Sequence, residues 1–227
     1  ARNKRIKIGW KDKAILALSQ SDYRNYIYPI FTPSGISLTA ESPIDHPHHQ
    51  SISIGADHFN CYLPFGDDKF EEANYSFYVN YTFQGRAPGR IISNSIKNNE
   101  ITENHLRITQ ILFWQGPEEW GAPGRRHVAT EKRIIDIYPG QNSNIVDIRS
   151  ILKPTKWEIA IGPTRHGYFT IRLADGLRMV DGGSLVNSAG ITGKNILSNM
   201  NSHWVDAYGP SYKGNMVGLA IFPYSNT

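Results

Sequence analysis

The residues best suited to chemistry form a short histidine-rich segment, Asp45–His49, with the sequence Asp-His-Pro-His-His. It holds three of the chain's eight histidines, His46, His48 and His49. Imidazole titrates near neutral pH and also binds metals, so this cluster can transfer protons or hold a cation. Asp45 can orient one ring by accepting a hydrogen bond from it. The alternative is a surface loop whose rings cap neighbouring turns, but three imidazoles beside an aspartate and a proline favour a functional site.

The proline within this segment predicts its backbone. Pro47 fixes its own φ and favours an extended backbone at His46. In an extended segment His46 and His48 lie on one side and His49 on the other. A metal site of the cupin type needs His-x-His followed closely by a glutamate, but the next glutamate is Glu71. We therefore predict a role in proton transfer, with no metal and no cofactor.

Two further segments carry candidate catalytic residues. Arg165 and His166 precede a strand predicted at Tyr168–Leu173, where Arg165 can bind an anionic or hydroxyl-rich group or form a charge at a strand edge. Glu131 lies on a strand predicted at Val128–Tyr138. There it can face a cleft as an acid or base, or it can form an ion pair across strands.

Five residues are candidates for substrate binding. Asp57, His58 and Asn60 follow the strand predicted at residues 51–54, although Asp and Asn are also common in turns. Trp204 can stack on a sugar ring, and Asp206 can bind hydroxyl groups or act as a catalytic carboxylate. Tryptophan is equally common in protein cores, so this assignment has a structural alternative.

Alternation of apolar and polar residues predicts β-strands along most of the chain. The clearest alternation covers residues 75–83, whose apolar row is expected to face a core: Tyr75, Phe77, Val79, Tyr81 and Phe83. Further strands are predicted at Tyr26–Phe31, Leu106–Trp114, Val128–Tyr138, Asn144–Leu152, Trp157–Ile161, Tyr168–Leu173 and Met216–Phe222. Ala14–Leu18 is predicted as a short helical turn. Strands separated by Gly and Pro turns indicate an all-β, antiparallel β-sandwich of the jelly-roll or super-sandwich type, as one domain over residues 1–227.

Composition limits the function classes. The 227 residues include 40% hydrophobic and 19% charged residues, which is typical of a globular domain. Cys61 is the only cysteine, so no disulfide can form within the chain. The net charge of +4 comes from scattered basic residues, which does not predict nucleic-acid binding. No apolar run reaches the length of a membrane span. The chain begins without methionine, which suggests a removed export leader or a trimmed start.

Several motifs in a fixed order resemble a bacterial family known as "methane oxygenase PmoA-like". The resemblance covers roughly residues 26–226, and the His-Pro-His-His element is its most specific part. The motifs are Tyr28–Pro29, Thr32–Gly35, Asp45–His49, Arg165–Arg172, Val186–Gly190, Trp204–Gly209 and Gly218–Phe222. Members of that family resemble secreted or periplasmic proteins from a sugar-degradation context. The resemblance therefore implies an oligo- or polysaccharide substrate and a periplasmic or secreted location.

The chain departs from that family pattern at two places. The family commonly has a glutamate at the position of His166, so the resemblance implies no acid role there. The family pattern also continues beyond the Phe222–Pro223 region, whereas this chain ends at Thr227. We therefore expect that a C-terminal piece of the site is missing or comes from a second polypeptide or a second copy of the chain.

These observations predict a carbohydrate-active enzyme that cleaves a glycosidic bond by hydrolysis or elimination. In this hypothesis the histidine segment transfers protons, Glu131 or Asp206 supplies a carboxylate, and Trp204 supplies a stacking surface. The first alternative is a carbohydrate-binding β-sandwich without catalysis. The second is a metal-dependent oxygenase.

Overall fold

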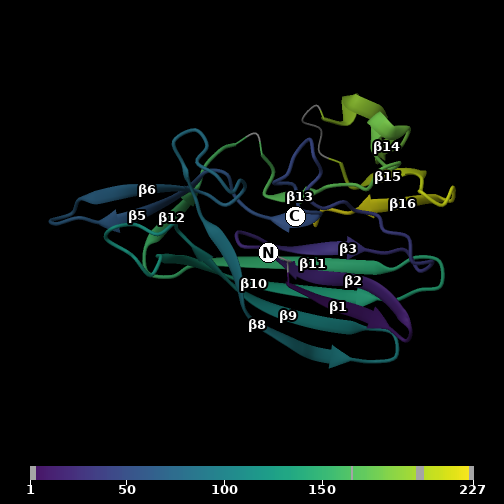
Figure 1. Ribbon diagram of the computed structural model, residues 1–227, viewed down its shortest axis with the longest axis horizontal. Coiled ribbons are helices and arrows are strands. Elements are labelled where there is room, and N and C mark those ends of the chain that lie inside the picture. The colour runs from purple at the N-terminus through teal and green to yellow at the C-terminus, as the bar shows by residue number, and fades with distance from the viewer. Residues whose placement is uncertain (1–3, 165, 198–201, 225–227) are drawn as a thin grey trace.

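The fold consists almost entirely of β-strands (Figure 1). The computed structural model describes residues 4–164, 166–197 and 202–224. The strands are β1 (Lys4–Trp10), β2 (Lys13–Gln20), β3 (Asn25–Ile30), β4 (Ile52–Ile54), β5 (Phe59–Pro64), β6 (Phe70–Ser76), β7 (Ala87–Pro88), β8 (Arg90–Ile101), β9 (Leu106–Gln115), β10 (His127–Tyr138), β11 (Ile145–Pro154), β12 (Glu158–Ile161), β13 (Phe169–Ile171), β14 (Ser184–Asn187), β15 (Val205–Pro210) and β16 (Met216–Ile221). Two 3₁₀ turns, η1 (Met179–Asp181) and η2 (Gly193–Leu197), complete the set. The predicted all-β antiparallel sandwich is confirmed.

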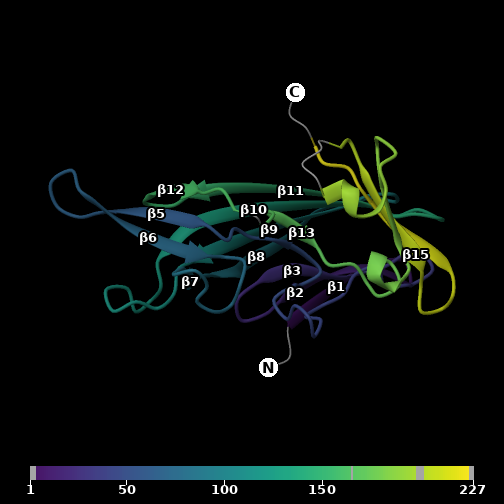
Figure 2. The same ribbon diagram turned by 90° about the horizontal axis from the view of Figure 1, so that it is seen from above.

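Four sheets make up the sandwich. The long strands form the sheet β11-β10-β9-β8, and the sheets β1-β2-β3-β4-β13 and β12-β5-β6-β7 pack against it. A smaller sheet, β14-β15-β16, lies at one end of the molecule (Figures 1 and 2). Among the paired strands of the described residues, only β6 and β7 run parallel. In the part of the chain that the structure describes, no helix combines the length and apolar character needed to cross a membrane.

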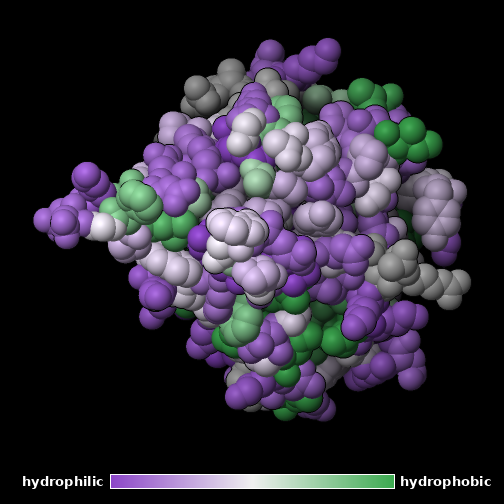
Figure 3. Space-filling view, turned by 60° about the vertical axis from the view of Figure 1, so that its left-hand side comes forward, coloured by the Kyte–Doolittle hydropathy of each residue, from purple (hydrophilic) through white to green (hydrophobic). Residues whose placement is uncertain are grey.

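The core has two apolar clusters that meet along the long strands. One cluster joins β1–β4 to β9 and β10, and the other joins β5 and β6 to β8, β9 and β10. Ile148 packs against both clusters. The alternating burial of β9 follows from its period of two, which directs every second side chain into the core. The side of the molecule that Figure 3 shows is mainly hydrophilic, and its hydrophobic side chains lie in separate groups.

A buried ionic pair lies between the two apolar clusters. Glu131 is fully buried on β10, and both of its carboxylate oxygens accept hydrogen bonds from Arg133, at 2.8 and 3.1 Å. Trp114 Nε1 and Ser150 Oγ also donate to Glu131, each at 3.0 Å. A third guanidinium hydrogen bond joins Arg133 to Asn25 Oδ1 at 3.0 Å. The expectation that Glu131 faces a cleft is therefore wrong, because alternation directs it into the core.

Two predicted elements differ from the observed ones. Ala14–Leu18 lies inside β2 and is not helical, because its run of buried residues belongs to a strand between β1 and β3. The strand predicted at residues 75–83 ends at Ser76. The Ser76 hydroxyl accepts hydrogen bonds from the backbone N–H groups of Tyr78 and Val79, at 3.3 and 3.4 Å. This side chain competes with strand pairing and turns the chain.

The segment that follows Ser76 depends on a glycine for its close packing. A Cβ on Gly55 would lie 2.3 Å from the carbonyl oxygen of Phe77, a residue whose N–H donates to Ala56 O. We expect Gly55→Ala to lower the free energy of unfolding by about 1–3 kcal/mol, because the backbone of residues 77–78 must shift. Urea denaturation tests this. Gly124→Ala, whose Cβ would meet nothing within 4 Å, is the matched control and should be near neutral. Equal stability of the two variants would contradict the close packing.

Candidate active site

The histidine segment is a pair of turns. The N–H of His46 donates to Pro43 O at 3.0 Å, and the N–H of His49 donates to His46 O at 2.9 Å. The expected extended backbone, with His49 opposite the other two rings, is therefore wrong. The second turn has Pro47 at its second position, where the fixed φ of proline suits a β-turn. Consecutive turns bring the three imidazoles together.

The three rings pack directly on one another. The rings of His46 and His49 stack with centroids 4.6 Å apart, and His48 meets His49 edge-on at 4.6 Å. Asp45 accepts a hydrogen bond from His46 Nδ1 at 3.0 Å and two from the guanidinium of Arg172, at 2.8 and 2.7 Å. These hydrogen bonds, first from Arg172 and then from His46, hold the pKa of Asp45 below its ordinary value. Asp45 therefore anchors the segment to the neighbourhood of β13.

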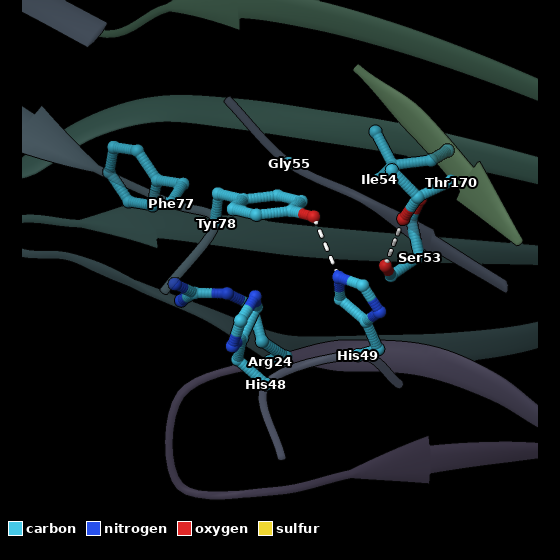
Figure 4. A pocket seen from close by; sticks show the side chains of 9 residues that line it. All are labelled: Arg24, His48, His49, Ser53, Ile54, Gly55, Phe77, Tyr78 and Thr170. Atoms are coloured by element: carbon cyan, nitrogen blue, oxygen red, sulfur yellow. Dashed lines mark hydrogen bonds between the residues drawn. The ribbon is translucent and has the colours of Figure 1, made fainter. Parts of the chain in front are cut away.

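Tyr78 connects this segment to His166. The Tyr78 hydroxyl and His49 Nε2 form a hydrogen bond of 2.9 Å, drawn in Figure 4. On its other side the Tyr78 ring stacks on His166, with centroids 4.5 Å apart and planes inclined by 17°. His48 also meets Tyr78 edge-on, at 5.4 Å. Tyr78 thus lies among imidazoles from segments that are distant in the sequence.

A buried carboxylate orients His166. Asp57 is 2% exposed and lies 2.8 Å from His166 Nδ1. Thr164 Oγ1 and Arg86 also donate to its Oδ2, at 3.1 and 3.2 Å. Burial alone raises the pKa of Asp57, but the His166 hydrogen bond and the Arg86 charge outweigh burial and hold that pKa below its ordinary value. The ionised Asp57 fixes which nitrogen of His166 faces it and leaves the other nitrogen for chemistry.

The imidazoles and Tyr78 line an open cleft of about 730 Å³, a size typical of ligand sites. Its wall contains all three histidines of the segment and also His166 and Tyr78. The remaining lining residues are Asp45, Pro47, Val79, Asn80, Tyr81 and Phe83. The described part of the chain contains no group of three His, Cys, Asp or Glu side chains arranged to hold a metal ion.

Burial and neighbouring charges keep two of these imidazoles neutral. Burial and the charges of His46 and His166 lower the pKa of His48 below 6.5. Burial, with the charges of the neighbouring histidines and Arg172, lowers the pKa of His49 to about 4. Conversely, burial and the charge of Asp57 raise the pKa of Tyr78 above 10. At neutral pH the cleft therefore offers imidazoles that can accept a proton and a phenol that retains one.

The lowered pKa of His49 predicts how stability depends on pH. The unfolded chain protonates this histidine near pH 6.5, but the folded chain does so only near pH 4. Its stabilising contribution is therefore complete above pH 6.5 and is lost as the pH falls toward 4. In thermal denaturation from pH 7 to pH 4, His49→Gln should lose less stability than the unchanged protein. A greater loss in the variant would contradict this account.

Four predicted binding residues, His58, Asn60, Trp204 and Asp206, do not line the cleft. The His58 ring packs on Gly162, because a Cβ added to Gly162 would lie only 2.3 Å from His58 Nδ1. Asn60 lies on β5, directly opposite Asn74 of β6. Trp204 and Asp206 belong to the β14–β16 region, where Trp204 O accepts the N–H of Ser188 and Asp206 pairs with Val186 and Ala220. Arg165 lies outside the described residues. Asn60 and Asp206 therefore lie on paired strands outside the cleft.

Sequence reasoning missed Tyr78, Arg172 and Arg86. The sequence does carry a signal for Tyr78. It is a large aromatic residue in the otherwise polar row of residues 75–83, between Ser76 and Asn80. Arg172 was visible only as the last residue of a motif that also contains His166. Arg86 carried no local signal, because it reaches Asp57 only through the fold.

Comparison with known protein families gives a match. The model of a family described as "Family of unknown function (DUF6807)" matches residues 12–227. The chain belongs to this family. No curated protein and no solved structure matches the chain. For this member of the DUF6807 family, functional inference therefore rests on the geometry of the cleft.

Proposed function

We propose that this DUF6807 protein cleaves a glycosidic bond in an oligo- or polysaccharide, with the histidine cleft transferring the protons. The observation that carries the proposal is the convergence of His48, His49 and His166 with Tyr78 on one open cleft. Glycosidic cleavage needs a group that removes a proton and a group that protonates the leaving oxygen. Neutral imidazoles and a protonated phenol meet that need.

Aromatic and polar side chains at the rim of the cleft are suited to binding a sugar. Tyr81 is 51% exposed and lies against Phe83 with ring centroids 6.3 Å apart. Exposed aromatic faces bind the apolar faces of sugars, while neighbouring polar groups bind the hydroxyls. Asn80, which directly precedes Tyr81 in the sequence, supplies such a polar group in the lining of the cleft. We also propose a periplasmic or secreted location, on the resemblance to the PmoA-like family alone.

The experiment is release of reducing ends from a panel of plant and algal glycans. We expect release by the unchanged protein and a loss of at least about 100-fold when His46, His48 and His49 are together replaced by glutamine. His203→Gln is the control, because this exposed histidine lies away from the cleft. Thermal denaturation confirms that each variant is folded. Undiminished release by the triple variant would refute the assignment.

A carbohydrate-binding protein without catalysis is the second candidate, and the exposed Tyr81 favours it. It predicts glycan affinity that survives loss of the histidines and falls in Tyr81→Ala. No observation favours the metal-dependent oxygenase, since the imidazoles pack ring against ring.

A further inference from the structure

The cleft is poor in carboxylates. Most glycoside hydrolases place one carboxyl group on each side of the scissile bond. Among the described lining residues only Asp45 carries a carboxylate, and Arg172 and His46 occupy it. Asp57 is 2% exposed and lies behind His166, and Glu131 is buried in the core. The described residues therefore do not supply the pair that hydrolysis uses.

The cleft instead pairs an imidazole with a phenol. His48 makes ring contacts but has no hydrogen bond from its ring nitrogens to any described residue, so these nitrogens are available to a substrate. Its ring centroid lies 5.4 Å from that of Tyr78. A neutral imidazole can remove a proton from carbon if that proton is made acidic by a neighbouring carboxylate. The phenol can protonate the oxygen that leaves.

A buried positive charge lies behind these groups. Arg24 is 5% exposed and, with His48, His49 and Tyr78, lines a small space of about 10 Å³ (Figure 4). Among the described residues, its guanidinium donates only to the carbonyl oxygens of Tyr23, Val79 and Gly89, and its buried Nε has no partner there. No carboxylate of the described residues pairs with Arg24.

Burial lowers the pKa of Arg24 to about 9, so the group stays charged at neutral pH. A cation that no carboxylate of the described chain neutralises favours an anion in the adjacent cleft. Its field also stabilises negative charge that develops there during a reaction. The substrate should therefore carry a carboxylate close to the bond that breaks.

We propose that the cleft cleaves uronate-containing glycans by β-elimination, a proposal that rests on the proposed function of glycosidic cleavage. His48 removes the proton from the carbon next to the uronate carboxylate. The electron pair of that C–H bond forms a double bond to the neighbouring ring carbon, and the bond from that carbon to the glycosidic oxygen breaks. Tyr78 donates its proton to the leaving oxygen, and the proton on His48 returns to Tyr78 through solvent. No water molecule, oxidant or reductant is consumed.

The first experiment separates elimination from hydrolysis. Galacturonan, glucuronan, alginate and a neutral glucan are incubated with the full chain in water enriched in heavy oxygen. We expect each cleaved uronate bond to give one reducing end and one ultraviolet-absorbing unsaturated residue, with no heavy oxygen in the products. Saturated products that carry heavy oxygen would overturn elimination but leave glycosidic cleavage standing. No cleavage of any glycan would overturn both proposals.

The second experiment tests the acid. Tyr78→Phe should lower elimination of a natural uronan by at least about 100-fold. The same variant should retain activity on a synthetic uronate whose leaving group is an acidic phenol, because that group departs without protonation. Tyr212→Phe, on an exposed tyrosine outside the cleft, is the control. Equal losses on both substrates would overturn the role of Tyr78 as the acid.

Discussion

Replacing His48 by alanine should lower kcat by about 10²- to 10⁴-fold, the range typical of a lost general base. The ring is half-buried at the cleft wall, contacts Tyr78 and is neutral at neutral pH. Its removal leaves a space beside Tyr78 without disturbing the hydrogen bonds of Asp57 or Asp45. The measurement is kcat on a cleaved glycan.

Added imidazole should restore part of the lost rate in His48→Ala, because it can enter the vacated space and accept the proton. A purely structural role for His48 would give no such rescue. In the unchanged protein, kcat/KM should rise with pH as His48 loses its proton below pH 6.5. It should fall again as Arg24 loses its charge near pH 9, before Tyr78 ionises above pH 10. Activity of His48→Ala equal to that of the unchanged protein would contradict the proposed base.

The second large effect concerns stability. Glu131→Gln should lower the free energy of unfolding by about 3–5 kcal/mol, because it leaves the guanidinium of Arg133 buried without its counter-charge. Combining Glu131→Gln with Arg133→Met should recover much of that loss, since no uncompensated charge remains. Urea denaturation of the single and double variants measures both effects.

Two comparisons sharpen this stability prediction. Lys132→Met, on the exposed face of the same strand, should change stability by less than about 0.5 kcal/mol. Folded Glu131→Gln should also keep its kcat, because Glu131 does not line the cleft. If Glu131→Gln kept normal stability but lost its kcat, the structural role of Glu131 would be wrong and a catalytic role would replace it.

The strands could be predicted from the sequence because their signal is local. Alternation alone locates β9 and β10 to within a residue or two. Alternation fails at Ala14–Leu18. This segment lies in a strand between two neighbouring strands, and its apolar residues form a continuous run without alternation. Alternation also fails after Ser76, where a single hydroxyl ends the strand.

The candidate site, like the fold, has parts that the sequence reveals and parts that it does not. The histidine segment is visible because three imidazoles are adjacent in the sequence. The contact between Asp57 and His166 spans 109 positions and depends on the packing of whole sheets, so no local pattern reveals it. For Glu131 the decisive signal was present, because a period of two places Arg133 on the same face of the strand.

If glycans bind and react in the histidine cleft, the histidines themselves can report the binding. Ring proton signals of the eight histidines are followed by NMR during titration with a uronate oligosaccharide. We predict that shifts concentrate on the cleft group, His46, His48, His49 and His166, and spare His58, His105, His127 and His203. Shifts confined to the second group, with the cleft signals unmoved at saturating ligand, would contradict the account.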